Sequence, residues 1–415
     1  MTPILILILA ILIAGFLVDF TLDLLNISAL KTGLPPLLAG EYSAESFSKS
    51  QLYQREAGKF GLVGSSLSFV VIILMFILGG FTWVHEWVAT VTDTVIISAL
   101  LFFGILMLGS GILSLPLDIW STFVIEEKYG FNKTTPRIFI LDKIKSLALL
   151  LVIGVPLAAL VIWIYTLTGR SFWLWTWLVL SVFSLFLSFF YSTLIVPLFN
   201  RQKPLDEGPL RTAIESLAVR ADFPLRNIFV IDGSKRSSKS NAYFAGFGSK
   251  RRIVLYDTLI RDLDENQILA VLAHEIGHYR KKHILFSMLL SVLQTGLMLF
   301  LFSLVVGNPI FSEALNIDEP TFHIGLLIFG ILFSPVSELT GLFFNKLSRS
   351  FEYQADAFAE GLGCGTDLAS GLLRLSEINL SNLTPHPAYV FVHYSHPTLM
   401  QRLCRLRKDC KTIRL

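Results

Sequence analysis

The stretch Leu272–Val306, LAHEIGHYRKKHILFSMLLSVLQTGLMLFLFSLVV, joins two patterns that seldom occur together. Its first residues include two histidines and a glutamate, which are groups that bind and use a metal ion. The remainder is apolar enough to enter a lipid bilayer, whose core a helix crosses with about 20 apolar residues. We therefore expect a metal-binding helix that continues directly into a membrane span.

The composition of the whole chain also indicates a membrane protein. Of its 415 residues, 53% are hydrophobic and only 16% are charged, which is more apolar than is usual for a soluble protein of this length. We expect a mainly α-helical protein with about seven membrane spans, near residues 3–18, 61–83, 94–117, 146–168, 173–199, 284–306 and 323–344.

Charges in the loops predict how these spans are oriented. The loops after spans one and three carry several Lys and Arg residues, whereas residues 84–93 and 307–322 carry none. Because positively charged loops remain in the cytoplasm, the N-terminus is expected outside and the large polar segments in the cytoplasm. The expected organisation is spans one to five with their loops in 1–199, polar segments in 200–283 and 345–415, and spans six and seven in 284–344.

The HExxH pattern of His274, Glu275 and His278 predicts a metal site on a helix whose N-cap is Asp264. The two histidines are four residues apart, so both imidazoles project from one face and can bind one ion. Glu275 is rotated by roughly 100° around the helix axis, where it can reach a water molecule on that ion. Two packed histidines without a ligand are the less favoured interpretation, because the pattern is rare by chance.

A catalytic zinc site needs a third protein ligand, and a helix expected at 350–361 offers one. Glu352 and Asp356 are again four residues apart, beside small alanines that would allow close packing against Gly277. In one interpretation Glu352 binds the metal and Asp356 accepts a hydrogen bond from a ligand histidine. In the other both are ordinary exposed carboxylates, and the residues alone leave the two interpretations open. Two histidines, one glutamate and an open position are typical of a zinc peptidase.

The polar segment 200–283 also predicts a small α+β unit. An amphipathic helix is expected over 209–221, and strands are expected at 227–233, 241–246 and 252–257, the last two joined by a turn around Gly248. Residues Asn241, Ala242, Tyr243 and Phe244 either form an open sheet edge, where a peptide adds as another strand, or simply support the neighbouring helix.

Six segments together resemble the type I CaaX prenyl endopeptidases, which are membrane zinc metalloproteases. They are STFVIEEKYGFNKTT, VPLFNRQKPLDEGPLRTAIESLA, FVIDGSKRSSKSNAYFAGF, VLAHEIGHY, FEYQADAFA and YSHPTLMQRL, and they follow one another in the order that the family shows. The resemblance implies a barrel of seven membrane helices around an enclosed chamber, with a gluzincin-like zinc protease domain that carries a small β-sheet.

The resemblance also assigns roles to residues. It implies one Zn²⁺ per chain bound by His274, His278 and Glu352, with Glu275 as general base and Asp356 beside a ligand histidine. It places Asn241, Ala242, Tyr243 and Phe244 at the edge that pairs with substrate. His396 and Arg402 would stabilise the tetrahedral intermediate or position the substrate carbonyl, although their pattern alone indicates only a helix start and a solvated charge.

The predicted function is therefore zinc-dependent hydrolysis of peptides or proteins that are membrane-anchored or prenylated, with the lipid bilayer as a second partner. A net charge of +3 gives no indication of nucleic-acid binding. The alternatives are a quality-control protease without prenyl specificity, and a non-catalytic zinc-dependent scaffold or transporter. The tail CKTIRL is not a retrieval signal, which favours a bacterial member in the inner membrane over one in the endoplasmic reticulum.

Overall fold

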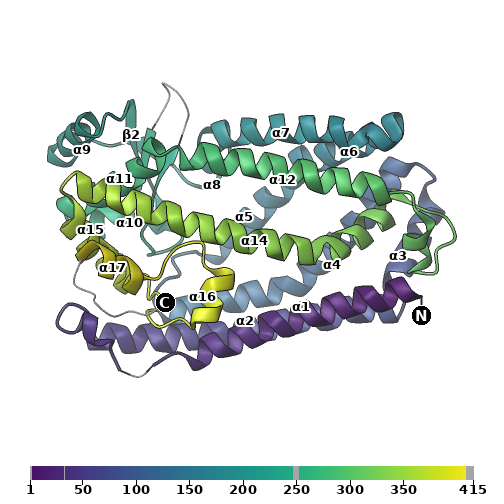
Figure 1. Cartoon of the computed structure of the whole chain (residues 1–415), viewed down its shortest axis with the longest axis horizontal. Coiled ribbons are helices and arrows are strands. Elements are labelled where there is room, and N and C mark those ends of the chain that lie inside the picture. Colours follow the sequence, from purple (N-terminus) through teal and green to yellow (C-terminus); the bar gives the residue numbers. More distant parts are fainter. Residues whose placement is uncertain (1, 32, 246–251, 408–415) are drawn as a thin grey trace.

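The computed structural model describes residues 2–31, 33–245 and 252–407. Figure 1 shows an elongated bundle whose long helices run side by side along the longest axis. A small sheet and several short helices gather at one end of this bundle (Figure 1). The long apolar helices and the polar segments therefore form distinct regions of one molecule.

The long helices contain the expected spans. They are α1 (Pro3–Ser28), α2 (Ala44–Ile77), α4 (Val95–Trp120), α5 (Pro136–Leu149), α6 (Val155–Thr168), α7 (Phe172–Phe190), α12 (His283–Val305) and α14 (Phe322–Gly361). Short π-helical turns extend α4 and α7 and join α5 to α6, over Ser121–Glu126, Tyr191–Ile195 and Leu150–Gly154. The shorter helices α3 (Gly80–Val91), α8 (Val196–Phe199) and α13 (Pro309–Glu313) belong to the same region.

Within the described residues, six helical stretches are long and apolar enough to span a membrane. One of them, Pro136–Phe199, has 64 residues and contains two expected spans. A straight helix of that length would measure about 96 Å, roughly three times the hydrocarbon core of a bilayer. The chain instead reverses at Gly169, whose φ of 54° favours glycine, and α6 packs back against α7. Six of the seven expected spans therefore lie in continuous helical stretches, and the second, expected over 61–83, is interrupted at Gly79 between α2 and α3.

The spanning helices, together with the short helix α3, form a closed ring. Helix α1 packs on α2, which contacts α3, and α3 packs on α4. Helix α4 packs on α6, and α6 packs on α7. Helix α7 packs on α12, α12 contacts α14, and α14 packs on α1, which closes the ring. This circuit confirms the expected fold class, a mainly helical barrel of membrane helices. It also places α12 and α14, which lead to the candidate metal site, next to each other.

The expected helix through Leu272–Val306 is wrong in one respect. The structure has two helices there, α11 (Glu265–Arg280) and α12, and they are separated at Lys282. Lys282 has a φ of 59°, a left-handed conformation that interrupts a right-handed helix and that non-glycine residues seldom adopt. Helix α11, which carries the HExxH pattern, therefore ends before span six begins.

The second candidate helix, expected at 350–361, is joined to span seven in one continuous helix. Residues 323–344 and 350–361 were expected as separate elements, yet α14 is continuous over 40 residues and includes Pro335 in its interior. Glu352 and Asp356 therefore lie on a helical extension of span seven. This continuity fixes their position relative to the membrane helices.

The small sheet is mixed and has four strands in the order β1-β2-β4-β3. They are β1 (Gln202–Pro204), β2 (Asn227–Ile231), β3 (Ala242–Ala245) and β4 (Arg252–Tyr256). The parallel pair β2 and β4 lies at the centre, and β3 is antiparallel to β4 at an edge. The three strands predicted in this region are confirmed, and the turn expected around Gly248 lies outside the described residues.

Apolar side chains from the sheet and the short helices form the core that supports α11. This core joins α9 (Pro209–Arg220), α10 (Asp257–Asp262), α15 (Gly365–Ile378) and α17 (Leu399–Arg407), and α16 (Pro387–His393) packs against α1 and α14 nearby. Fully buried members include Ile214, Leu217, Ile253, Leu255, Leu259, Ile268, Leu272 and Leu403. Because α11 contributes one face to this core, its orientation is fixed.

Candidate metal centre

The N-terminus of α11 is fixed by the expected capping box. The Asp264 carboxylate accepts a hydrogen bond from the Gln267 N–H at 2.9 Å, and the Gln267 side chain accepts one from the Asp264 N–H at 3.2 Å. These bonds satisfy two N–H groups that a helix start would otherwise leave without partners. The helix then presents His274 and His278 on the side that faces α14.

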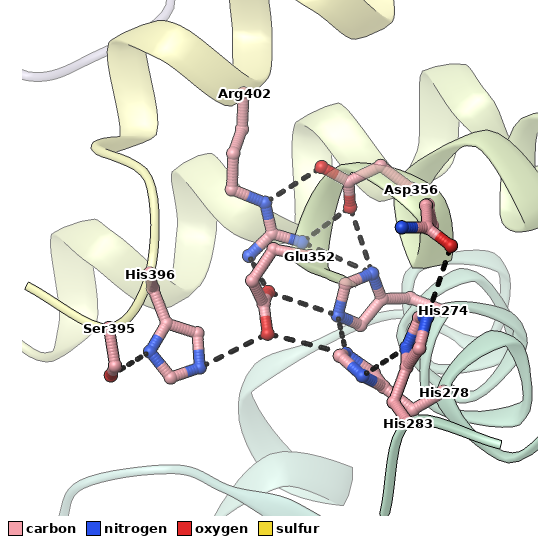
Figure 2. A network of polar contacts seen from close by, with 9 residues as sticks. His274, His278, His283, Glu352, Asp356, Ser395, His396 and Arg402 are labelled. Atoms are coloured by element: carbon pink, nitrogen blue, oxygen red, sulfur yellow. Dashed lines mark hydrogen bonds and ion pairs between the residues drawn. The ribbon is translucent and has the colours of Figure 1, made fainter. Parts of the chain in front are cut away.

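Two histidines and one carboxylate converge between α11 and α14. The Nε2 atoms of His274 and His278 are 3.2 Å apart. Glu352 Oε2 lies 3.4 Å from His274 Nε2, and Glu352 Oε1 lies 3.3 Å from His278 Nε2. One donor atom from each residue falls within 4.8 Å of the others, and this is the one such group of three among the described residues. Figure 2 shows the three side chains directed toward one another.

The state of Glu352 indicates that a cation fits here. Its side chain is 5% exposed, and its Oε2 atom has no hydrogen-bond partner. The nearest cation, the Arg402 guanidinium, has its Nη1 atom 3.5 Å from this oxygen and is shared with Asp356, so the hydrogen-bonding capacity of the oxygen is left for a further cation. Two imidazoles, one carboxylate and an open position form the donor set of catalytic zinc sites.

Asp356 and Arg402 hold one of the two histidines. Asp356 Oδ1 lies 2.8 Å from His274 Nδ1, the nitrogen that faces away from the converging ligand atoms. Arg402 donates from Nε to Asp356 Oδ2 at 3.0 Å and from Nη2 to Oδ1 at 2.6 Å (Figure 2). Its Nη1 atom lies 3.5 Å from Glu352 Oε2. Arg402 is therefore buried between two carboxylates, on the side of α14.

His396 approaches from the open side of the same cluster. It lies in the loop between α16 and α17, and its Nε2 atom is 3.3 Å from Glu352 Oε1. Its Nδ1 atom is 2.9 Å from the Ser395 hydroxyl. The side chain is 63% exposed, in contrast to the buried Arg402, so an incoming molecule can contact it.

Glu275 lies on α11 between the two histidines. Burial raises the pKa of its carboxyl group. A carboxyl with a raised pKa holds a proton more readily, as a general base requires.

The edge strand β3 lies beside α11. The carbonyl of Asn241 accepts a hydrogen bond from the Tyr256 N–H at 3.1 Å, so its backbone faces β4. Successive residues of a strand direct their backbone groups to opposite sides, and Ala242 and Phe244 therefore face the open edge. The Oδ1 atom of the Asn241 side chain accepts a hydrogen bond from the Ala242 N–H at 2.8 Å. Tyr243 lies 3.5 Å from the Ser192 hydroxyl, and for Phe244 only the backbone is described.

Two residues at the site were not expected. His283 Nδ1 lies 3.1 Å from His278 Nδ1, and Gln354 lies next to His283. Residues five apart do not share a helix face, so the sequence pattern gave no reason to pair His278 with His283. The turn at Lys282 brings them together, and that turn has no Gly or Asn to indicate it.

Comparison with known proteins identifies the family. Residues 23–201 match the family described as CAAX prenyl protease N-terminal, five membrane helices, and residues 204–409 match Peptidase family M48. The CAAX prenyl protease 1 homolog of Arabidopsis thaliana is 38% identical over 94% of this chain and 94% of its own. The chain belongs to the CAAX prenyl protease 1 family. It is thus a multi-pass membrane metallopeptidase.

Other members of this family are similar over nearly their whole length. CAAX prenyl protease 1 of Saccharomyces cerevisiae is 38% identical and the homolog of Homo sapiens is 34% identical, each over 91% of this chain and 89% of the relative. A crystal structure of S. mikatae Ste24p has a TM-score of 0.93 at 37% identity and covers 98% of this chain and 99% of its own. These relatives are eukaryotic, so the expectation of a bacterial member in an inner membrane is not supported.

Proposed function

We propose that this member of the family hydrolyses peptide bonds of membrane-associated substrates with one bound Zn²⁺, and that prenylated CaaX peptides are its substrates. The observation that carries the zinc chemistry is the convergence of His274, His278 and Glu352, in which a buried oxygen of the Glu352 carboxylate has no hydrogen-bond partner. The prenylated substrate is supported by the names of the relatives, which are CAAX prenyl proteases.

Glu275 is the proposed proton carrier. A zinc ion held by the three ligands would polarise a water molecule and the scissile carbonyl. Glu275, one residue from His274 on the same helix, accepts a proton from the attacking water. The same carboxyl then donates the proton to the leaving amine, so it acts first as a base and then as an acid.

His396 and Arg402 support the reaction in different ways. The exposed His396 imidazole is placed to donate a hydrogen bond to the oxygen on which negative charge develops. Arg402 is fully engaged with Asp356 and close to Glu352. This geometry favours a positioning role, in which Arg402 holds Asp356 against His274, over direct contact with the reacting carbonyl.

The open edge of β3 is the proposed substrate-binding strand. An extended peptide can pair with the outward-facing backbone groups of Ala242 and Phe244, after it displaces the Asn241 side chain from the Ala242 N–H. Pairing with the main chain fixes the register of a peptide without requiring a particular side chain. The strand adjoins α11, so a peptide bound there runs beside the metal ligands.

The membrane helices are proposed to present lipid-anchored substrates. Glu352 lies on the continuation of a membrane span, which keeps the metal at a fixed depth relative to the bilayer. A substrate with a lipid anchor reaches that depth already oriented, and this lowers the entropic part of the barrier. The distribution of Lys and Arg supports a cytoplasmic position for the site.

Cleavage of a fluorescence-quenched CaaX peptide, with and without a farnesyl group, tests this proposal. The full chain is loaded with zinc in lipid vesicles, and mass spectrometry identifies the bond that is cut. We expect hydrolysis next to the farnesylated cysteine, at least about tenfold slower when the lipid is absent, because remote binding energy is lost. Equal cleavage of both peptides would contradict the prenylated substrate, and a zinc-loaded protein that cuts neither would contradict the peptidase reaction.

A further inference from the structure

His283 is the first residue of α12, yet its side chain packs against the metal-binding helix. Its Nδ1 atom lies 3.1 Å from His278 Nδ1, and its Nε2 atom lies 3.3 Å from Gln354 Oε1. The ring stacks on Phe351 with a centroid distance of 4.1 Å and an interplanar angle of 9°. His283 is only 4% exposed. Figure 2 shows the ring of His283 beside His278, on the side away from Glu352.

The proton positions follow from the chemistry of metal binding. His278 directs Nε2 toward His274 and Glu352, so this nitrogen is the metal-binding one and carries no proton. A neutral imidazole then has its proton on Nδ1 and must donate it. The acceptor at 3.1 Å is Nδ1 of His283. His283 in turn carries its proton on Nε2 and donates it to the Gln354 carbonyl oxygen.

The two ligand histidines are therefore held by different partners. His274 donates from Nδ1 to the carboxylate of Asp356, whereas His278 donates to a neutral imidazole. Partners of this kind fix the tautomer and the ring orientation of a metal-binding histidine. Helix α14 supplies Glu352, Gln354 and Asp356, so one helix binds the metal and organises both histidines.

We propose that His283, oriented by Gln354, is a positioning residue that holds His278 in its metal-binding tautomer. The left-handed conformation of Lys282 directs the start of span six back toward the metal and so makes this contact possible. The contact couples the membrane helix α12 directly to a metal ligand. This inference rests on the proposed function, in which His278 binds zinc.

The test compares zinc release from the full-length wild type and three variants, His283→Leu, His283→Asn and Gln354→Leu, measured with a chromophoric chelator. We expect His283→Leu to weaken zinc binding by about 10- to 100-fold, the range typical for loss of such a partner. Asparagine places an amide oxygen near the position of Nδ1, so His283→Asn should restore most of the affinity. The visible spectrum of the Co²⁺-substituted protein should change in the leucine variant and stay close to wild type in the asparagine variant.

A buried histidine elsewhere provides the matched control. His323 is 3% exposed and lies on α14, at a distance of about 44 Å along that helix from Glu352. His323→Leu removes a buried imidazole and should leave zinc release and the Co²⁺ spectrum unchanged. If His283→Leu does not fold, Gln354→Leu still tests the chain of contacts from Gln354 through His283 to His278. A smaller loss of zinc affinity is expected for this variant.

The outcomes separate this inference from the proposed function. Zinc release from His283→Leu within twofold of wild type would overturn the inference. So would an asparagine variant no better than the leucine variant, because the ring would then act only through packing. A wild-type protein that binds no zinc would instead overturn the proposed function.

Discussion

Gly277 of α11 lies directly against the backbone of Ala355 in α14. A methyl group at Gly277 would lie 3.0 Å from the Ala355 Cα atom, 3.1 Å from its carbonyl oxygen and 3.1 Å from Phe358 Cβ. The two helices that supply the proposed metal ligands can therefore approach only because this position has no side chain. The expected close packing through Gly277 and small residues of the second helix is confirmed.

Gly277→Ala should weaken the metal site without unfolding the membrane helices. The added methyl meets backbone atoms that cannot rotate away, so α11 and α14 must separate by a few tenths of an ångström and move Glu352 away from the histidines. We expect about a tenfold loss of zinc affinity, comparable to a misplaced ligand partner, measured by competition with a chelator.

Two further variants make this test specific. Gly330→Ala, at a position of α14 with no atom within 4 Å of the added methyl, should bind zinc like wild type. Because the added methyl would meet backbone atoms of Ala355 and Cβ of Phe358, and not the Ala355 side chain, adding Ala355→Gly should not restore affinity. Recovery in the double variant would show that the side chain of Ala355, rather than its backbone, limits the approach.

Arg402→Met should lower stability as well as activity. The substitution leaves the buried Asp356 and Glu352 without their shared counter-charge, and the loss of one partner of a buried ion pair costs about 3–5 kcal/mol. Thermal unfolding of the metal-free protein measures this effect. A variant with wild-type stability but lost turnover would contradict the positioning role and favour direct contact of Arg402 with the reacting carbonyl.

Ala242→Pro should impair substrate binding selectively. Proline removes the N–H that faces the open edge of β3 and retains the bonds between β3 and β4, which involve the alternate residues. The loss of a main-chain hydrogen bond predicts about a tenfold lower kcat/KM with zinc content unchanged. Ala242→Val keeps the N–H and serves as the control. Equal kcat/KM in the proline and valine variants would exclude strand pairing at this position.

Removal of the metal should abolish activity and leave the helical bundle intact. The membrane helices contact one another in a closed ring that does not involve the ligand residues of α11. After chelation, circular dichroism should therefore retain its helical signal, and added zinc should restore activity. Zinc should also raise Tm, since a ligand present at 100 times its Kd stabilises the folded state by about 2.7 kcal/mol. Loss of the helical signal on chelation would show that the metal holds the fold together.

The membrane helices and the cluster of His274, His278 and Glu352 could be predicted from sequence because each depends on a local pattern. Apolar length identifies a span, and spacing by four residues places His274 and His278, or Glu352 and Asp356, on one helix face. The six ordered motifs also led to the correct family. A bacterial source was inferred only from the missing retrieval tail, which says nothing about the family's distribution.

The connections between these elements were harder to predict. Nothing in the residues around Lys282 indicates a left-handed turn, because lysine has no preference for that conformation. The continuity of α14 from span seven into the segment 350–361 was not expected, because the polar stretch NKLSRS at 345–350 ends the apolar pattern of the span. Both features depend on packing between α11, α12 and α14, and the contact of His278 with His283 follows from them.

Hydrolysis of the farnesylated peptide by wild type and Glu275→Gln, at matched zinc content in lipid vesicles, tests the central claim most directly. Glutamine preserves the shape of Glu275 and cannot carry the proton, so zinc binding should persist. The rate should fall by about 10²- to 10⁴-fold, the usual contribution of a general base. A Glu275→Gln variant that holds zinc and cleaves the peptide at the wild-type rate would contradict the account.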